Sequence, residues 1–189
     1  MPKKIATEED WIQLGFAQFA EGGEGALVIE RLARSLGTSK TSFYWYFKDR
    51  ASFLRRIIDE WRQRSTASLI TDSSLDGLSA QEAILIVLQG MFAPNQSRDF
   101  LYHLRRLGHS TPNYAEQLAQ IETARLSHMS ALLAAMGHPP GIAGHKAELL
   151  YSYYLGWHER QHGREQHAAE SEAAIALIWP YLERKGSEC

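Results

Sequence analysis

Residues 157–163 read WHERQHG and contain His158-Glu159-Arg160-Gln161-His162, an H-E-x-x-H string. On a helix, two histidines four residues apart lie on one face and can bind zinc. The glutamate beside the first histidine can then act as the general base that activates a zinc-bound water. The string therefore raises the hypothesis of a zinc metallohydrolase or a metal-responsive protein.

The residues around the string do not complete a protease site. His167 follows His162 by five residues, but Gly163 is expected to end the helix before it. Glu165 and Ala168 stand where the metzincin spacing requires a glycine and a third histidine. Glu183 is available as a later carboxylate ligand, but no strand is evident that could bind an extended substrate. We therefore expect a protein that is not an enzyme and holds no metal or cofactor, with the metallohydrolase kept as the alternative hypothesis.

Composition indicates an ordinary globular protein. The chain has 189 residues, of which 44% are hydrophobic and 22% charged, with a formal net charge of −2. Its single cysteine, Cys189, excludes an internal disulfide and a C-x-x-C metal knuckle. The longest apolar run, residues 83–88, is far too short to span a bilayer. We expect a cytoplasmic protein that does not associate with a membrane.

The hydrophobic pattern predicts an all-α fold. No segment alternates apolar and polar residues in the manner of a strand, whereas helical spacing with start and stop signals recurs throughout. Thr7 and Asp10 can form a capping box, and Asp49 can cap a helix that runs to about residue 72. The other expected helices cover about residues 28–36, 39–46, 80–92, 98–107, 112–136, 142–162 and 166–184.

Positive charge gathers in one segment of this slightly acidic chain. Between Arg31 and Arg56 there are seven basic residues and one acid, Asp49. On charge alone, such a segment is either a solvated face or a surface that binds phosphates.

The same segment, ERLARSLGTSKTSFYWYFKDR at 30–50, carries a helix-turn-helix pattern. Ala33 supplies the small residue where two short helices cross, and Gly37 supplies the turn residue that tolerates a positive φ. Phe43 returns an apolar side chain to the small core. Ala, Gly and an aromatic residue at these offsets are typical of a DNA-binding helix-turn-helix.

Residues 37–50 resemble the TetR-family signature Gly-Val-Ser-x-x-Thr-Leu-Tyr-x-His-Phe-x-x-Lys, and Phe53-Leu54 match the apolar pair that follows it. Detailed resemblance covers about residues 10–56. It implies a three-helix DNA-binding domain at 1–48 and a helical effector-binding and dimerisation domain at 49–189, linked by the helix that starts near residue 49.

The resemblance also implies which residues contact DNA. Tyr44, Lys48 and Arg50 would hold phosphates, and Trp45 and Tyr46 would pack on the sugar-phosphate edge. The four residues implied to face the bases are Ser39, Lys40, Thr41 and Ser42.

Four positions depart from the family pattern. Val28 replaces the Thr or Ser that often caps the second helix, Tyr46 replaces the usual His, and Arg50 replaces Lys while keeping its charge. Glu30 is acidic near where relatives often place a cation or a polar group, so it either narrows the choice of operator or points to solvent.

By this resemblance the protein is a regulator, most simply a repressor, that binds a palindromic double-stranded operator as a homodimer and is released by a small molecule. The last two helices would form the dimer interface, with an apolar stripe at Ala174, Ile175, Ile178, Tyr181 and Leu182. Aromatic residues and methionines of the middle helices suggest a small apolar or aromatic effector. The candidate ligand-binding residues are Met91, Phe92, Phe100, His103, Tyr114, Met129, Tyr151, Tyr154 and Trp157.

Overall fold

A computed structural model describes residues 6–67, 77–93, 98–164 and 167–183 of the chain. Within these ranges all regular structure is helical, with nine α-helices and no strand, so the predicted all-α class is confirmed. No described helix is both long and apolar enough to cross a membrane.

The chain divides into two compact units. The N-terminal unit comprises residues 1–65 and 96–116, and the C-terminal unit comprises residues 66–95 and 117–189. This division differs from the expected domains 1–48 and 49–189, because α4 (Arg50–Arg62) and α7 (Arg98–Ser110) both pack into the N-terminal unit.

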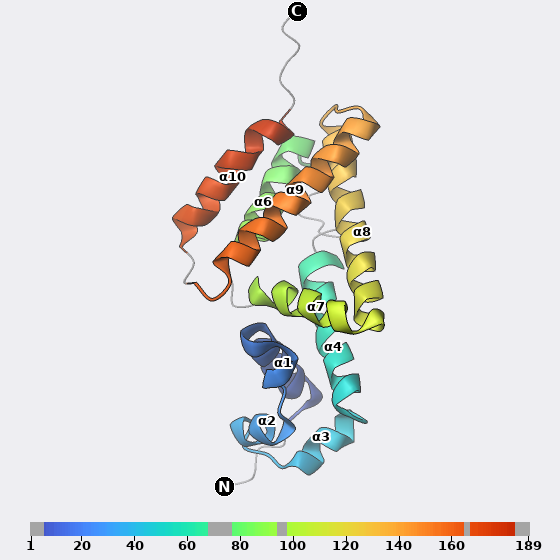
Figure 1. Cartoon of the computed structure of the whole chain (residues 1–189), viewed down its shortest axis with the longest axis vertical. Helices are drawn as coiled ribbons and strands as arrows, with labels where there is room; N and C mark the ends of the chain where they lie inside the picture. Colours follow the sequence, from blue (N-terminus) through green and yellow to red (C-terminus); the bar gives the residue numbers. More distant parts are fainter. Residues whose placement is uncertain (1–5, 68–76, 94–97, 165–166, 184–189) are drawn as a thin grey trace, which may run out of the picture. The chain divides into compact units, whose positions relative to one another are not determined.

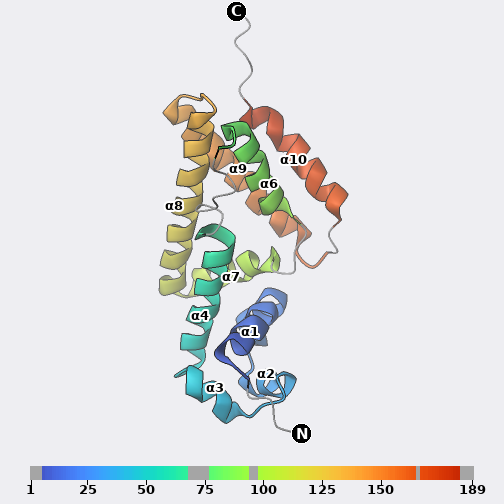
Figure 2. The ribbon, with the colours of Figure 1, turned by 180° about the vertical axis from the view of Figure 1, so that it is seen from behind.

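The N-terminal unit begins with α1 (Glu8–Gly22), followed by α2 (Ile29–Ser35), α3 (Lys40–Tyr46) and α4 (Figure 1). The predicted capping box of α1 is confirmed. The Asp10 backbone N–H donates to the Thr7 hydroxyl (3.2 Å), and the Thr7 backbone N–H donates to the Asp10 carboxylate (2.9 Å). Seen from behind, α3 leads through a short turn into α4 (Figure 2).

Gly15 sets how closely α1 approaches α4. A Cβ at this position would lie 2.6 Å from Ile57 Cδ1 and 3.0 Å from Phe53 Cε1, far inside van der Waals contact. Phe53 and Ile57 are both fully buried. The sequence of α1 therefore needs a residue without a side chain where the two helices cross.

Helix α7 completes the core of the N-terminal unit. The Phe100 ring lies between Phe16, Phe19 and Trp61, with centroid distances of 5.0, 4.5 and 5.2 Å. Because Phe100, Phe19 and Trp61 are all buried, this aromatic cluster joins α1, α4 and α7 into one packed body.

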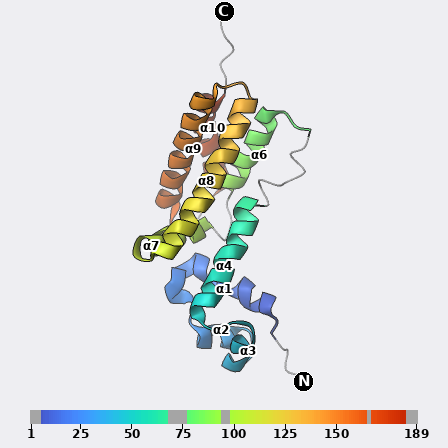
Figure 3. The ribbon, with the colours of Figure 1, turned by 90° about the vertical axis from the view of Figure 1, so that its right-hand side faces the viewer.

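The C-terminal unit contains α6 (Ala80–Phe92), α9 (Pro140–Gln161), α10 (Ala168–Leu182) and most of α8 (Pro112–Ala135) (Figure 3). Phe92 on α6 contacts Tyr154 and Trp157 of α9 edge-on, at 5.7 and 5.1 Å between centroids.

Two side chains cap the carboxyl end of α10. The Lys146 ammonium donates to the Tyr181 carbonyl (2.5 Å), and His138 Nε2 lies 2.7 Å from the Leu182 carbonyl. A helix end leaves carbonyls without an internal partner and carries a partial negative charge, so a cation stabilises it.

Candidate DNA-binding interface

The turn between α2 and α3 is a Schellman motif. Gly37 has φ +65°, its N–H donates to the Arg34 carbonyl (3.1 Å), and the Thr38 N–H donates to the Ala33 carbonyl (2.9 Å). These two bonds satisfy carbonyls at the end of α2, and only glycine adopts this backbone without steric cost. The predicted role of Gly37 is confirmed, and buried Ala33 lies in the core beside Leu32 as expected.

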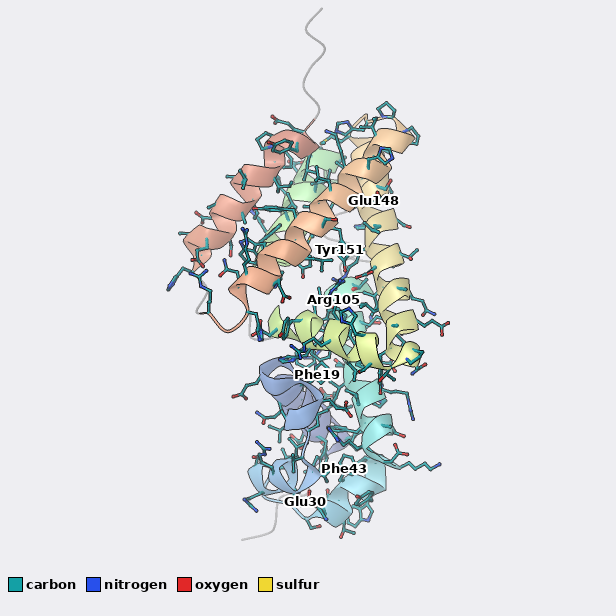
Figure 4. The ribbon with its side chains drawn as sticks, in the orientation of Figure 1. Phe19, Glu30, Phe43, Arg105, Glu148 and Tyr151 are labelled. Carbon is teal, nitrogen blue, oxygen red and sulfur yellow. The ribbon has the colours of Figure 1, made fainter. Side chains whose placement is uncertain are left out.

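Helix α3 has one buried face and one exposed face. Phe43 is fully buried and contacts Trp11 edge-on, Phe47, and Phe53 of α4, with centroids 5.3, 5.1 and 5.2 Å away (Figure 4). Aromatic packing on three sides fixes the rotation of α3 about its axis, and so determines which side chains it presents to solvent.

The exposed face carries most of the predicted DNA-contacting residues. Tyr44 is 54% exposed and Trp45 is 69% exposed, both far more than is usual for aromatic residues in a folded domain. The other residues of the set that lie exposed are Ser39, Lys40, Thr41, Tyr46, Lys48 and Arg50.

Ser42 departs from the prediction that it faces bases. It is 3% exposed, and the Trp11 indole N–H points at its hydroxyl across 3.5 Å. Because Ser42 precedes Phe43 on the inner side of α3, a small polar residue there lets α3 approach α1 and gives the buried indole a partner. The prediction of an exposed Ser42 is wrong, and the exposed face consists of the residues on either side of it.

Two of the cations on this surface are already paired with acids. The Lys40 ammonium lies 2.6 Å from a carboxylate oxygen of Glu30, the first-turn acid of α2. The Arg50 guanidinium lies 3.5 Å from the Glu24 carboxylate and also donates to the Glu24 carbonyl. Lys48, two residues after the end of α3, is exposed.

Helix α4 starts at the predicted cap. Asp49 accepts hydrogen bonds from the Ser52 backbone N–H (2.7 Å) and the Ser52 hydroxyl (2.8 Å). These bonds hold the pKa of the Asp49 carboxyl below its usual value, with the backbone N–H contributing most. Val28 precedes α2 and offers no side-chain cap, as its replacement of Thr or Ser predicts.

Sequence reasoning missed one contact of the interface. The Tyr46 hydroxyl donates to the backbone carbonyl of Ala6 (3.2 Å), which is 3% exposed, and this contact joins the residue before the α1 cap to the end of α3. No short motif links residues forty positions apart. The replacement of the family's His by Tyr was the available signal, because a phenol reaches farther than an imidazole.

The H-E-x-x-H string does not form the helical face that zinc binding requires. Helix α9 ends at Gln161, so His162 has left the helix with φ −56° and ψ 130°, and Gly163 follows with φ +70°. His158 is 8% exposed, with Nε2 lying 3.3 Å from the Met91 carbonyl. Within the described ranges no three His, Cys, Asp or Glu side chains gather as metal ligands. The predicted helix end near Gly163 is confirmed.

Three of the predicted ligand-binding residues belong to the N-terminal unit. Phe100 is part of its aromatic cluster, and the His103 ring lies edge-on to Phe19 at 6.0 Å. Tyr114 is 8% exposed, and burial raises the pKa of its phenol.

The other six belong to the C-terminal unit, where Met91 is partly buried and Phe92, Met129, Tyr151, Tyr154 and Trp157 are buried. Polar groups accompany them. The Tyr151 hydroxyl donates to the Glu122 carboxylate (3.3 Å), and Arg125 donates to Thr66 (3.0 Å) and hydrogen-bonds Tyr154. Burial raises the pKa of the Tyr154 phenol, against the smaller opposite effect of Arg125.

The apolar stripe predicted for dimerisation is mostly internal. Ala174, Ile178 and Leu182 are buried against neighbouring helices of the C-terminal unit, and Ile175 is partly buried. Of the predicted stripe only Tyr181 is well exposed, at 61%, and Leu177 beside it is 63% exposed. Residues three and four apart on one helix share a face, so α10 has two apolar faces and only the second points outward.

Comparison with known proteins agrees with this geometry. Residues 12–57 match the family model for bacterial regulatory proteins of the tetR family. No curated protein sequence matches the chain.

Solved structures with the same fold include a TetR transcription regulator from Haloarcula marismortui (TM-score 0.76, 17% identity, covering 92% of this chain and 95% of that one). A transcriptional regulator from Rhodococcus sp. Rha1 has a TM-score of 0.75 at 15% identity, with 94% of each chain covered. A regulator of the TerR/AcrR family from Aquifex aeolicus has a TM-score of 0.70 at 15% identity, covering 93% and 99%.

The family match coincides with the helix-turn-helix, and the fold agrees over more than nine tenths of the chain. Residues 12–57 are therefore a DNA-binding domain of the tetR family, and the chain has the fold of solved transcriptional regulators of that family.

Proposed function

We propose that this regulator is a repressor that binds a palindromic operator as a homodimer and leaves it when a small molecule binds. The observation that carries the proposal is the exposed face of α3, where two large aromatic side chains, Tyr44 and Trp45, stand in solvent beside cations. We further propose a cytoplasmic location, residues 1–48 as the DNA-binding domain and residues 49–189 as the effector-binding and dimerisation domain.

On this proposal α3 lies in the major groove. Ser39, the N-cap of α3, and Lys40 and Thr41 in its first turn contact base edges, since short polar groups and a lysine can bind donors, acceptors and thymine methyls there. Tyr44, Lys48 and Arg50 bind phosphates, and Trp45 and Tyr46 pack on the sugar-phosphate edge.

The dimer interface we propose is the outward face of α9 and α10. Ile142 and Leu149 on α9 are 47% and 49% exposed, and Leu177 and Tyr181 on α10 are more exposed still. Ile142 and Leu149 are seven residues apart, the spacing at which side chains return to one seam in packed helices. In sedimentation at micromolar concentration, Leu177→Glu is expected to shift the protein to monomer. A dimer of unchanged stability in that variant refutes this interface.

We propose that the effector is small and apolar or aromatic, with hydrogen-bonding groups, and that it binds among the aromatic residues of the C-terminal unit. Tyr151, Tyr154 and Arg125 supply polar groups beside apolar rings, a combination suited to such a ligand. Release from DNA then follows if the effector binds the non-DNA-binding conformation more tightly, by its differential affinity for the two.

DNA binding is tested by fluorescence anisotropy over a series of salt concentrations. The probe is the DNA fragment that the protein selects from the region upstream of its own gene. We expect nanomolar affinity and a steep fall in affinity with salt. Tyr44→Ala and Lys48→Ala are expected to weaken binding at least tenfold, because each removes a phosphate contact.

A matched control is Arg62→Ala, which removes one positive charge from α4 at a residue whose guanidinium faces Asp59 at 3.9 Å. If Arg62→Ala weakens binding as much as Lys48→Ala does, general charge rather than the α3 face governs binding, and the proposed interface is wrong.

A further inference from the structure

Glu30 and Lys40 form an ion pair across the two helices of the helix-turn-helix. The ammonium–carboxylate distance is 2.6 Å, although the side chains are 51% (Lys40) and 58% (Glu30) exposed and neither is held by burial. Figure 4 shows Glu30 on α2, in the part of the N-terminal unit where α2 and α3 meet. Both residues occupy the first turn of their helices.

The Glu30 carboxylate accepts from the Lys40 ammonium, a bond that a DNA phosphate could also make. It lies in the first turn of α2, where Val28 provides no side-chain cap. The hydrogen bond with Lys40 is the main cause that lowers the pKa of Glu30, and the same bond raises the pKa of Lys40. The pair therefore remains charged on both sides at neutral pH.

This arrangement sets a competition between Glu30 and DNA for the same ammonium. A phosphate that approaches Lys40 must displace the carboxylate and then remain close to its negative charge. On arbitrary DNA, where binding is almost wholly electrostatic, Lys40 then contributes little. A guanine edge offers its O6 and N7 acceptors without a full charge, so Lys40 can bind it with Glu30 still nearby.

We propose that Glu30 is a specificity-determining residue that withholds Lys40 from DNA phosphates and reserves it for a base edge in the operator. This inference rests on the proposed position of the α3 face in the major groove. Glu30 thereby lowers affinity for arbitrary DNA more than affinity for the operator, which raises the ratio between the two.

The expected effect of removing the carboxylate follows from the salt law of DNA binding. If Lys40 is released to neutralise one further phosphate, the slope of log K against log salt becomes steeper by about 0.9. The gain in affinity for arbitrary DNA is about fivefold, because an exposed ion pair of this kind is weak.

The test uses Glu30→Gln, Lys40→Met and the double variant. Binding is measured by anisotropy on an operator duplex selected from a random library by the wild-type protein, and on a scrambled duplex of the same length. Glu8→Gln is the matched control, since it removes the same charge from the same unit and breaks an exposed pair with Arg56 (3.5 Å).

Glu30→Gln is expected to bind the scrambled duplex about fivefold more tightly with the steeper slope, while the operator-to-scrambled ratio falls. The effect should vanish in the Lys40→Met background and be absent in Glu8→Gln. An unchanged ratio overturns the inference, as does a loss of operator affinity that persists without Lys40, which would mean that Glu30 itself contacts a base.

Different results refute the proposed α3 interface and the proposed role of Glu30. If Tyr44→Ala and Lys48→Ala weaken binding but Glu30→Gln leaves both duplexes unchanged, only the role of Glu30 is refuted. If none of these variants alters DNA binding, the proposed α3 interface is itself refuted.

Discussion

Gly15→Ala tests the crossing of α1 and α4 most directly. The new methyl group would lie 2.6 Å from Ile57 Cδ1, whereas carbon atoms in contact are ordinarily about 3.5–4.0 Å apart. Ile57 and Phe53 are fully buried, and protein interiors are close-packed, so we expect the helices to move apart by about 1 Å to restore that separation.

The magnitude follows from two opposing effects. Overpacking of this kind costs about 1–3 kcal/mol, and the alanine recovers about 1 kcal/mol because it favours the helix over glycine. We expect a net loss of about 0–2 kcal/mol in the free energy of unfolding, which lowers the melting temperature by up to about 8 °C in a chain of this size.

The assay is thermal and urea unfolding followed by circular dichroism, at one fixed protein concentration. Gly144→Ala in α9 is the matched control, because its Cβ would meet nothing within 4 Å. That substitution is expected to leave stability unchanged or raise it by up to about 1 kcal/mol. If Gly15→Ala is as stable as Gly144→Ala, the close approach of α1 and α4 is not real and the reasoning fails.

Three further substitutions test individual contacts. Asp49→Asn should make the protein less stable near neutral pH. Because a carboxyl with a lowered pKa gives this stabilisation only while it is ionised, the difference between variant and wild type should shrink as pH falls through the pKa of Asp49. Urea unfolding at several pH values measures this difference. Ser42→Ala should lower the free energy of unfolding by about 1 kcal/mol, because the Trp11 indole N–H loses its partner. The variant should keep the operator preference of the wild type in a selection experiment, and a changed preference would show that Ser42 does contact bases. Lys146→Met should lower the free energy of unfolding by about 0.5 kcal/mol in the same assay, because the Tyr181 carbonyl and its neighbours at the end of α10 lose their cation. A variant as stable as wild type would show that water replaces the ammonium at no cost.

The helix-turn-helix could be predicted from sequence because its constraints are local. Gly37 must have a positive φ, Ala33 must be small and Phe43 must be apolar, and each requirement restricts the residue type at one position. The same holds for the caps at Thr7 and Asp49, which are bonded to residues three positions away.

Ser42 could not be assigned correctly for the opposite reason. Its burial depends on Trp11, thirty-one residues earlier, and on the angle at which α1 crosses α3. A serine is compatible with both a surface and a tight helix crossing, so its type alone does not decide between them.

The proposed dimer face posed a similar ambiguity. Helix α10 is apolar on two sides, and spacing alone gives no means of telling which side meets the protein's own core. The inward side proved to be that of Ala174 and Ile178, and the outward side that of Leu177 and Tyr181.

The place of α7 in the N-terminal unit affects folding during translation and the choice of domain boundaries for expression. Phe100 is one wall of an aromatic cluster whose other members, Phe16, Phe19 and Trp61, are synthesised long before it. During translation these three rings remain uncovered until α7 leaves the ribosome, a period in which exposed apolar surface invites chaperones or aggregation. A gene fragment that stops at residue 65 would leave these rings exposed permanently. An isolated N-terminal unit should therefore be expressed with α7 joined to it, and not cut at the end of α4.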